Sequence, residues 1–335
     1  MINIFRYAIR GCMHRDTLLW VGTLDKMLAL SPEILVPQHT RPVEGQDTIK
    51  DIVTVYRDAI QYVHDQTVRY MNKGLSGLEI AKIVKLPPHL INHPYLIEYY
   101  GTVEWSVKAV YHGYIGWFSG RPQDLHPLGI SEEAKLMLDL AGGKDQMIKK
   151  AKDAVQAGNF QWGLKLTDTL VDSDQSTEEV KELRGVCLRK LAMNEVSAPG
   201  MNWYMTEDLV QDGLEIKPSD KARAQRIKAG AIRSLFNMLT CMLDAEATLD
   251  VNTTACFKFT DTNEEVAVVI RRGICFLPLI TPAKVDMEVV TTSKVWREVM
   301  ANERTAVAAG LTGEISVNTG IKQLGNFFAY FDTDV

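Results

Sequence analysis

The 335-residue sequence lacks several features that would place it in a specialised class of protein. Its five cysteines are scattered, without any C-x-x-C pair, which argues against a disulfide framework and against a cysteine zinc site. No apolar run approaches the length of a transmembrane helix, and the N-terminus, MINIFRYAIRGCMHRD, lacks the apolar centre of a signal peptide. We therefore expect no transmembrane segment and, by default, a reducing intracellular (cytoplasmic) compartment.

The chain also lacks an excess of basic residues and any familiar catalytic signature. Its formal net charge is −5, so neither nucleic acid nor an anionic membrane is favoured as a partner. There is no G-x-G-x-x-G, P-loop, G-x-S-x-G or kinase pattern, and the seven histidines form neither an H-x-H pair nor an H-E-x-x-H motif. The residues alone therefore define no complete active site.

The chain is long enough for two to three domains, and the first 45 residues read as an incomplete one. They predict a strand over residues 4–9, a helix over 16–30 and a short buried strand over 34–36. Two strands and one helix cannot close a core. This segment either packs onto the residues after it or is the remainder of a larger domain.

Residues 46–198 read as helical throughout. A long amphipathic helix is predicted over 46–74, and Ser76 with Glu79 forms a capping box for the next helix. An aromatic-rich helix over 103–118 should be buried on more than one face, either as a core or as the seam between two chains, with Trp105 and Trp117 among its rings. The helical hairpins beyond it are similar to tetratricopeptide units.

The sequence pattern changes after the loop-like stretch 197–200, where we place the boundary of a domain over residues 199–335. A helix is predicted over 221–247. A β-hairpin comes next, over 256–271, with further strands over 274–280, 285–291 and 314–317 and helices over 294–300 and 321–331. This pattern predicts an α+β domain with one antiparallel sheet covered by helices.

One histidine lies in a position that suits a metal ligand. His39 comes after a short apolar strand and lies on a loop stiffened by Pro37 and Pro42. A catalytic zinc needs about three protein ligands, so His39 alone cannot bind it. His89 and His93 have helical ligand spacing, but the prolines around them disfavour a continuous helix and favour a structural role.

Several long segments carry a resemblance to a known family. They are RGCMHRDTLLW, ILVPQHTRPVEG, YRDAIQYVHDQTVRYMNKGL, KLPPHL and YYGTVEWSVKAVYHGYIGWFSG, with LHPL after them. Together they resemble the alkylsulfatase branch of the metallo-β-lactamase superfamily. The resemblance implies an α+β multidomain fold with three parts. These are a remnant of the metallo-β-lactamase αββα domain (1–45), an all-α dimerisation domain with TPR-like hairpins (46–198), and a C-terminal α/β sandwich like sterol carrier protein 2 (199–335).

The resemblance also implies a function and site residues. Members hydrolyse linear alkyl sulfates to alcohol and sulfate at a two-zinc site, as homodimers that bind an alkyl sulfate or another amphiphile. Their H-x-H-x-D-H zinc pattern should lie N-terminal to residue 1, so we expect this C-terminal part to be inactive alone. His39 is the zinc ligand carried over. Arg10 would contact the sulfate, with Tyr7 and Arg15 as weaker candidates, although Arg10 is equally suited to pair with a carboxylate.

Two functions therefore stay open at this point. The chain is either part of a zinc-dependent sulfuric ester hydrolase, or a non-catalytic homodimeric scaffold with an SCP2-like module that binds lipid or alkyl chains. The first implies chemistry in which two zinc ions lower the pKa of a bridging water and an arginine steadies the sulfate.

Overall fold

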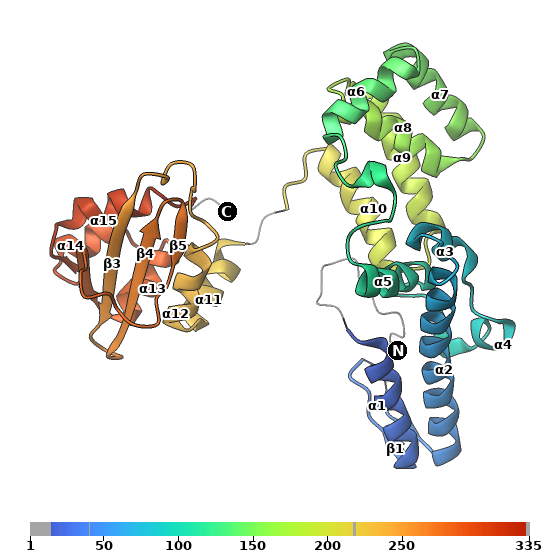
Figure 1. Cartoon of the computed structure of the whole chain (residues 1–335), viewed down its shortest axis with the longest axis horizontal. Coiled ribbons are helices and arrows are strands. Elements are labelled where there is room, and N and C mark those ends of the chain that lie inside the picture. Colours follow the sequence, from blue (N-terminus) through green and yellow to red (C-terminus); the bar gives the residue numbers. More distant parts are fainter. Residues whose placement is uncertain (1–14, 40, 217–218, 333–335) are drawn as a thin grey trace. The chain divides into compact units, whose positions relative to one another are not determined.

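The computed structural model describes residues 15–39, 41–216 and 219–332, and the chain divides into two compact units, Met1–Glu215 and Ile216–Val335 (Figure 1). Each unit has its own hydrophobic core. No helix within the described ranges is long and apolar enough to cross a membrane.

The first unit begins with two packed helices, as the sequence predicts. Helix α1 (Thr17–Ala29) is capped by the Asp16 carboxylate, and its Val21 and Leu24 contribute to the same core as the buried face of α2 (Gln46–Met71). This segment therefore packs onto the helix after it, one of the two options that the sequence left open. The predicted strand over 4–9 lies outside the described residues.

A short hairpin lies between α1 and α2 in the sequence. The prediction that its first strand is buried is wrong. Strand β1 (Ile34–Leu35) pairs antiparallel with β2 (Val43–Glu44), but Ile34 and Val36 are 61% and 72% exposed. Within the described residues a two-stranded sheet has too little area to bury both of its faces, so these apolar side chains remain at the surface.

After α2 come α3 (Gly77–Ile83), α4 (Pro88–Ile91), the 3-10 turn η1 (Pro94–Leu96) and α5 (Val103–Ile115). The predicted capping box at Ser76 and Glu79 is confirmed. The expectation that the aromatic helix is buried on more than one face holds only for its first half, where Val103, Val107 and Val110 are buried. From residue 112 onward α5 is exposed, and it ends at Gly116, whose φ of 84° ends the helix.

Antiparallel helices complete the first unit. They are α6 (Ile130–Leu140), α7 (Lys144–Gln156), α8 (Phe160–Asp172), α9 (Glu178–Asn194) and α10 (Ala198–Gln211), with the turn η2 (Pro122–Asp124) before α6. Gly158, with φ of 72°, lies in the turn between α7 and α8, as expected for the predicted break. Helix α10 begins at the predicted limit of this domain but packs on α9, and the division between the units falls later, at Glu215.

The second unit is a five-stranded sheet with strand order β5-β4-β3-β6-β7. The strands are β3 (Asn252–Phe259), β4 (Glu264–Arg271), β5 (Ile274–Phe276), β6 (Met287–Thr291) and β7 (Ser316–Val317). The predicted hairpin is confirmed, with Val268 opposite Ala255. The expectation of a purely antiparallel sheet is wrong, because β6 pairs parallel to β3. The chain returns to the far edge of β3 through a crossover, which sequence alternation does not encode.

Helices cover this sheet and close its aromatic core. They are α11 (Asp220–Ala229), α12 (Ile232–Leu239), α13 (Ser293–Met300), α14 (Ala306–Leu311) and α15 (Ile321–Phe328). Phe236 of α12 stacks on Trp296 of α13 at 5.8 Å between ring centroids, and both contact Phe257 of β3. The prediction of a single helix over 221–247 is wrong. Gly230 is extended and separates α11 from α12.

Candidate functional site

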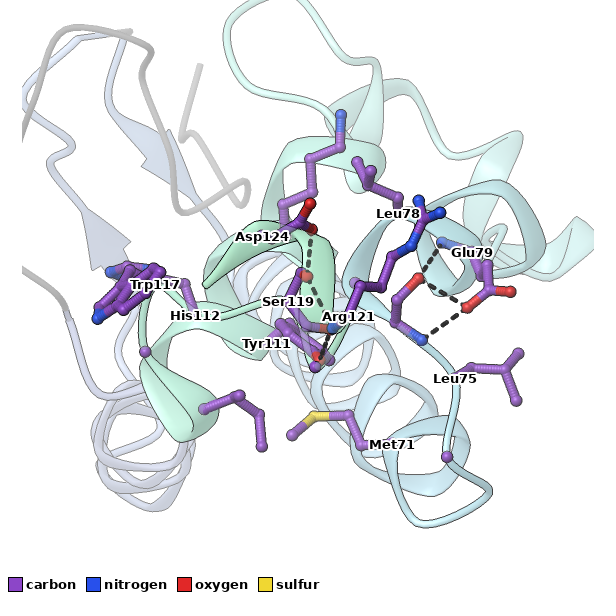
Figure 2. Close-up of a pocket in the computed structure, with 17 residues that line it drawn as sticks. Met71, Leu75, Leu78, Glu79, Tyr111, His112, Trp117, Ser119, Arg121 and Asp124 are labelled. Carbon is purple, nitrogen blue, oxygen red and sulfur yellow. Dashed lines mark hydrogen bonds between the residues drawn. The ribbon is translucent and has the colours of Figure 1, made fainter. Parts of the chain in front are cut away.

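A hollow of about 820 Å³ lies where the end of α2, the start of α3 and the second half of α5 meet the loop after α5 (Figure 2). Its lining is both apolar and polar. The apolar part includes Met71, Leu75, Leu78, Ile115 and Trp117, and the charged part consists of Glu79, Lys108, Arg121 and Asp124. A volume of this size suits a small ligand or a large side chain of another chain.

The wall formed by α3 is fixed by its N-terminal cap. The Ser76 amide and hydroxyl donate to Glu79 Oε2 at 2.8 and 2.7 Å, and these hydrogen bonds hold the pKa of Glu79 below its usual range. Gly77 sits directly against Tyr111, because a Cβ there would lie 2.9 Å from the Tyr111 ring. The first turn of α3 can therefore reach α5 only with glycine at this position.

The opposite wall is held by a chain of hydrogen bonds. The Tyr111 hydroxyl donates to the carbonyl of Ser119 at 3.3 Å, and the Ser119 hydroxyl donates to Asp124 at 2.5 Å. The Arg121 amide donates to the Ser119 hydroxyl at 3.1 Å. Figure 2 shows the Arg121 side chain extending from this loop toward Leu78 and Glu79. These contacts give the loop after α5 a defined conformation.

The four charged side chains that line the hollow differ in the partners they have. Lys108 pairs with Glu104 at 2.8 Å, and Glu79 and Asp124 accept hydrogen bonds from serines. Arg121 is exposed and, among the described residues, forms no ion pair; its guanidinium donates to Gln123 Oε1 at 3.4 Å. The lining thus offers an apolar surface beside two cations, Lys108, which is paired with Glu104, and Arg121, whose charge helps to lower the pKa of Glu79.

Next to the hollow, the exposed end of α5 is tied to α2 by a buried histidine. His64 is 7% exposed, with Nδ1 2.8 Å from Asp65 Oδ1 and Nε2 2.8 Å from the Tyr114 hydroxyl. Sequence reasoning did not single out His64, Arg121 or the hollow. The polar turn SGRPQD directly after an aromatic helix was the available signal for the loop, but the pairing of His64 with Tyr114 depends on contact between two helices.

The structure describes two of the four site residues predicted from the sequence. Tyr7 and Arg10 lie outside the described residues. Arg15 is exposed directly before α1, and His39 is exposed between β1 and β2. Of the predicted set, then, only these two are placed, and they lie on different segments.

The residues present do not fit a zinc centre. Across the described ranges, no group of three or more His, Cys, Asp or Glu side chains is arranged to hold a metal ion. His39 is a single ligand, and a catalytic zinc takes about three. We therefore assign no chemical step to a metal in the described part of the chain.

The fold defines the class of protein first. The fold is similar to that of a solved stereoselective inverting sec-alkylsulfatase, Pisa1 from Pseudomonas sp., with a TM-score of 0.87 and 27% identity, covering 96% of this chain and 52% of that one. A double mutant of the same enzyme gives a TM-score of 0.90 at 27% identity over 99% of this chain and 53% of that one. The chain is thus a helix-rich α+β protein of the alkylsulfatase fold.

The sequence comparisons find similarity to the same group of proteins. Residues 76–212 match the alkyl sulfatase dimerisation family. A linear primary-alkylsulfatase from Pseudomonas sp. is 32% identical over 97% of this chain and 64% of its own length. An alkyl/aryl-sulfatase from Saccharomyces cerevisiae is 26% identical over 97% of this chain and 51% of its own length. Residues 76–212 therefore match the alkyl sulfatase dimerisation model, and 97% of the chain is similar to proteins named alkylsulfatases, as its sequence motifs indicated.

These relatives are longer than the chain. It spans about half to two thirds of their length, from 64% in the linear primary-alkylsulfatase to 50% in an (R)-specific secondary-alkylsulfatase from Pseudomonas sp.. The match to the dimerisation family includes α3, α5 and the loop after α5 that lines the hollow.

Proposed function

We propose that the chain is part of a zinc-dependent hydrolase that cleaves linear alkyl sulfates to alcohol and sulfate. The observation that carries this proposal is similarity to proteins named alkylsulfatases over 97% of the chain. In this proposal residues 1–45 belong to a metallo-β-lactamase domain and 46–198 dimerise. Residues 199–335 form a module like sterol carrier protein 2, which offers an apolar surface to the alkyl chain.

We further propose that the chain is inactive alone. Two zinc ions need more ligands than His39, and the described residues supply no group that could complete them. Arg10, with Tyr7 and Arg15 as weaker candidates, would contribute contacts to the sulfate once the remaining ligands are present. The family match over 76–212 supports a homodimer as the assembled form.

Elemental analysis for zinc, combined with an assay of sulfate release from dodecyl sulfate, tests this proposal. The Pseudomonas linear primary-alkylsulfatase, assayed in parallel, is the positive control. We expect less than one zinc per chain and no turnover. About two zinc ions with turnover would contradict inactivity, and His39→Ala would then show whether His39 is one of the ligands.

A second measurement separates the hydrolase from a non-catalytic scaffold. The scaffold is favoured by one observation, the match to a dimerisation family in a chain whose described residues hold no metal group. Sequencing the transcript that encodes the chain shows whether an H-x-H-x-D-H segment precedes Met1 in frame. Its presence supports the hydrolase, and its absence would leave the scaffold.

A further inference from the structure

Large apolar side chains are exposed around the hollow. Leu78 and Trp117, which both line it, are 68% and 71% exposed, and Ile115 is 49% exposed. Tyr114, Leu125 and Leu128, on the same segment of chain, are each about half exposed or more. We call these six residues the Trp117 surface. Soluble chains rarely leave such a group open to water unless a partner covers it.

Hydrogen bonds hold the chain on both sides of Trp117. Tyr114 is anchored to buried His64, and the loop after Trp117 is fixed by the Tyr111, Ser119 and Asp124 hydrogen bonds. Side chains that are ordered before association lose little conformational entropy when they become buried. Rigid aromatic rings beside a hollow are typical of the residues that dominate binding energy.

The number of charged side chains near Trp117 differs from the number near Trp203, another exposed tryptophan of the same unit. Residues 111–130 contain two Asp, Glu, Lys or Arg side chains, Arg121 and Asp124, of opposite sign, and the other two charged residues of the hollow, Glu79 and Lys108, also have opposite signs. Trp203 on α10 is 62% exposed, but residues 198–215 contain four carboxylates and no Lys or Arg. Arg184 and Arg189 of α9 pair with two of these carboxylates. Interface centres are depleted of charge, and a two-fold contact brings each patch against its own copy. The Trp117 surface suits such a contact better.

We propose that two copies of the chain associate through the Trp117 surface, with Trp117 of each copy packing on the apolar rim of the other copy's hollow, at Leu78 and Ile115. This inference rests on the proposed homodimer and specifies the surface that forms it. Trp105 takes no part, because it is half-buried within its own unit. Apolar area and a hollow that can receive a ring drive the association, and the neutral charge of the patch permits it.

Sedimentation velocity of the 335-residue chain over a range of concentrations tests the proposal. Trp117→Arg is compared with Trp203→Arg, which makes the same change at a similarly exposed tryptophan of the same unit. We expect Trp117→Arg to weaken dimerisation at least roughly 30-fold, the effect of losing a dominant interface residue, and Trp203→Arg to change it less than about threefold. Leu78→Arg, on a different element, should act like Trp117→Arg, and far-UV circular dichroism should be unchanged in all three.

The outcomes separate the surface from the homodimer itself. A wild-type dimer that persists in both Trp117→Arg and Leu78→Arg would overturn the surface and leave homodimerisation intact. Dissociation by Trp203→Arg alone would assign the interface to α10 instead. A wild-type chain that is monomeric at every concentration would contradict the proposed homodimer as well as the surface.

Discussion

Nε2 of His64 lies 2.8 Å from the hydroxyl of Tyr114, so a buried side chain of α2 fixes the exposed end of α5. The other ring nitrogen of His64 lies 2.8 Å from Asp65. Because α5 leads directly into the loop that carries Trp117, this contact sets where the Trp117 surface begins. The contribution of the His64–Tyr114 contact to stability can be measured by removing one partner at a time.

His64→Phe keeps most of the ring volume and removes both hydrogen bonds. We expect it to lower the free energy of unfolding by about 0.5–1.5 kcal/mol, the net worth of a typical hydrogen bond. Urea unfolding monitored by circular dichroism gives the difference. His112→Phe is the matched control, since His112 is exposed and, within the described residues, its ring makes no hydrogen bond. A double-mutant cycle with Tyr114→Phe that gives no coupling energy would contradict the contact.

Gly163 sets the spacing between α8 and α9. A Cβ at this position would lie 2.8 Å from Sγ of Cys187, which is fully buried. We expect Gly163→Ala to destabilise the first unit by about 1–3 kcal/mol through overpacking, and the double variant with Cys187→Ala to recover part of that loss.

Gly22 of α1 provides the control for this change. Nothing lies within 4 Å of a Cβ at Gly22, so Gly22→Ala should stabilise the helix by up to about 1 kcal/mol. Thermal unfolding of the three variants and the wild type makes the comparison. Equal effects of Gly163→Ala and Gly22→Ala would refute the tight contact with Cys187.

Glu98 carries a charge that the fold disfavours. Burial raises the pKa of its half-buried carboxyl, and the hydrogen bond from the Val103 amide, 3.1 Å long, only partly offsets this. The folded state therefore binds this proton more tightly than the unfolded state. Its stability falls as pH rises from the unfolded pKa, about 4.3, through the raised folded pKa.

Glu98→Gln keeps an oxygen that can accept from the Val103 amide and removes the charge. We expect the variant to be at least as stable as the wild type at pH 7, with the difference shrinking as the pH is lowered through the folded pKa. Urea midpoints at pH 4 to 8 test this. A variant that is less stable at pH 7 and equally so at pH 4 would show that the charge is not the cause.

The pKa of Glu314, in the second unit, is lowered, whereas the pKa of Glu98 is raised. Hydrogen bonds from Arg304, at 2.5 Å, and from Thr312 lower the pKa of Glu314 to about 2. A carboxyl whose pKa is depressed in the folded state contributes stability above its unfolded pKa and loses it as pH falls toward the folded value. We expect this loss between about pH 4.5 and 2.

Two experiments check Glu314. Titration of its side-chain carboxyl by carbon-13 NMR should give a midpoint near 2. Glu314→Gln should flatten the acid limb of the stability profile, whereas Glu264→Gln, at an exposed carboxyl that begins β4, should leave it unchanged. A midpoint near 4.5 would refute the effect of Arg304.

Helix positions could be predicted from the sequence because their signals are local. The capping box at Ser76 and Glu79, the three-and-four spacing of α2 and the Gly158 break depend on residues within a few positions of one another. The same holds for the hairpin of β3 and β4, where alternation sets the register. Long, specific sequence motifs also carried the resemblance to alkylsulfatases without any structure.

The burial of individual side chains and the pairing of strands depended on contacts between segments that are distant in the sequence. The sequence of α5 and the loop after it is rich in aromatic residues along its length, but only tertiary packing, which includes contacts of α5 with α2 and α3, decided that Trp105 is half-buried and Trp117 exposed. The parallel pairing of β6 with β3 likewise required a crossover that no local pattern encodes.

Many of the elements were therefore determined by the sequence itself, through short-range periodicity, caps and turn residues, and the resemblance to alkylsulfatases rested on long sequence motifs. The tertiary structure decided which apolar side chains are covered, which strands are neighbours, and that His64 meets Tyr114 beside the hollow. The physical reason is that packing free energy depends on which surfaces meet, and that choice is made by the whole chain.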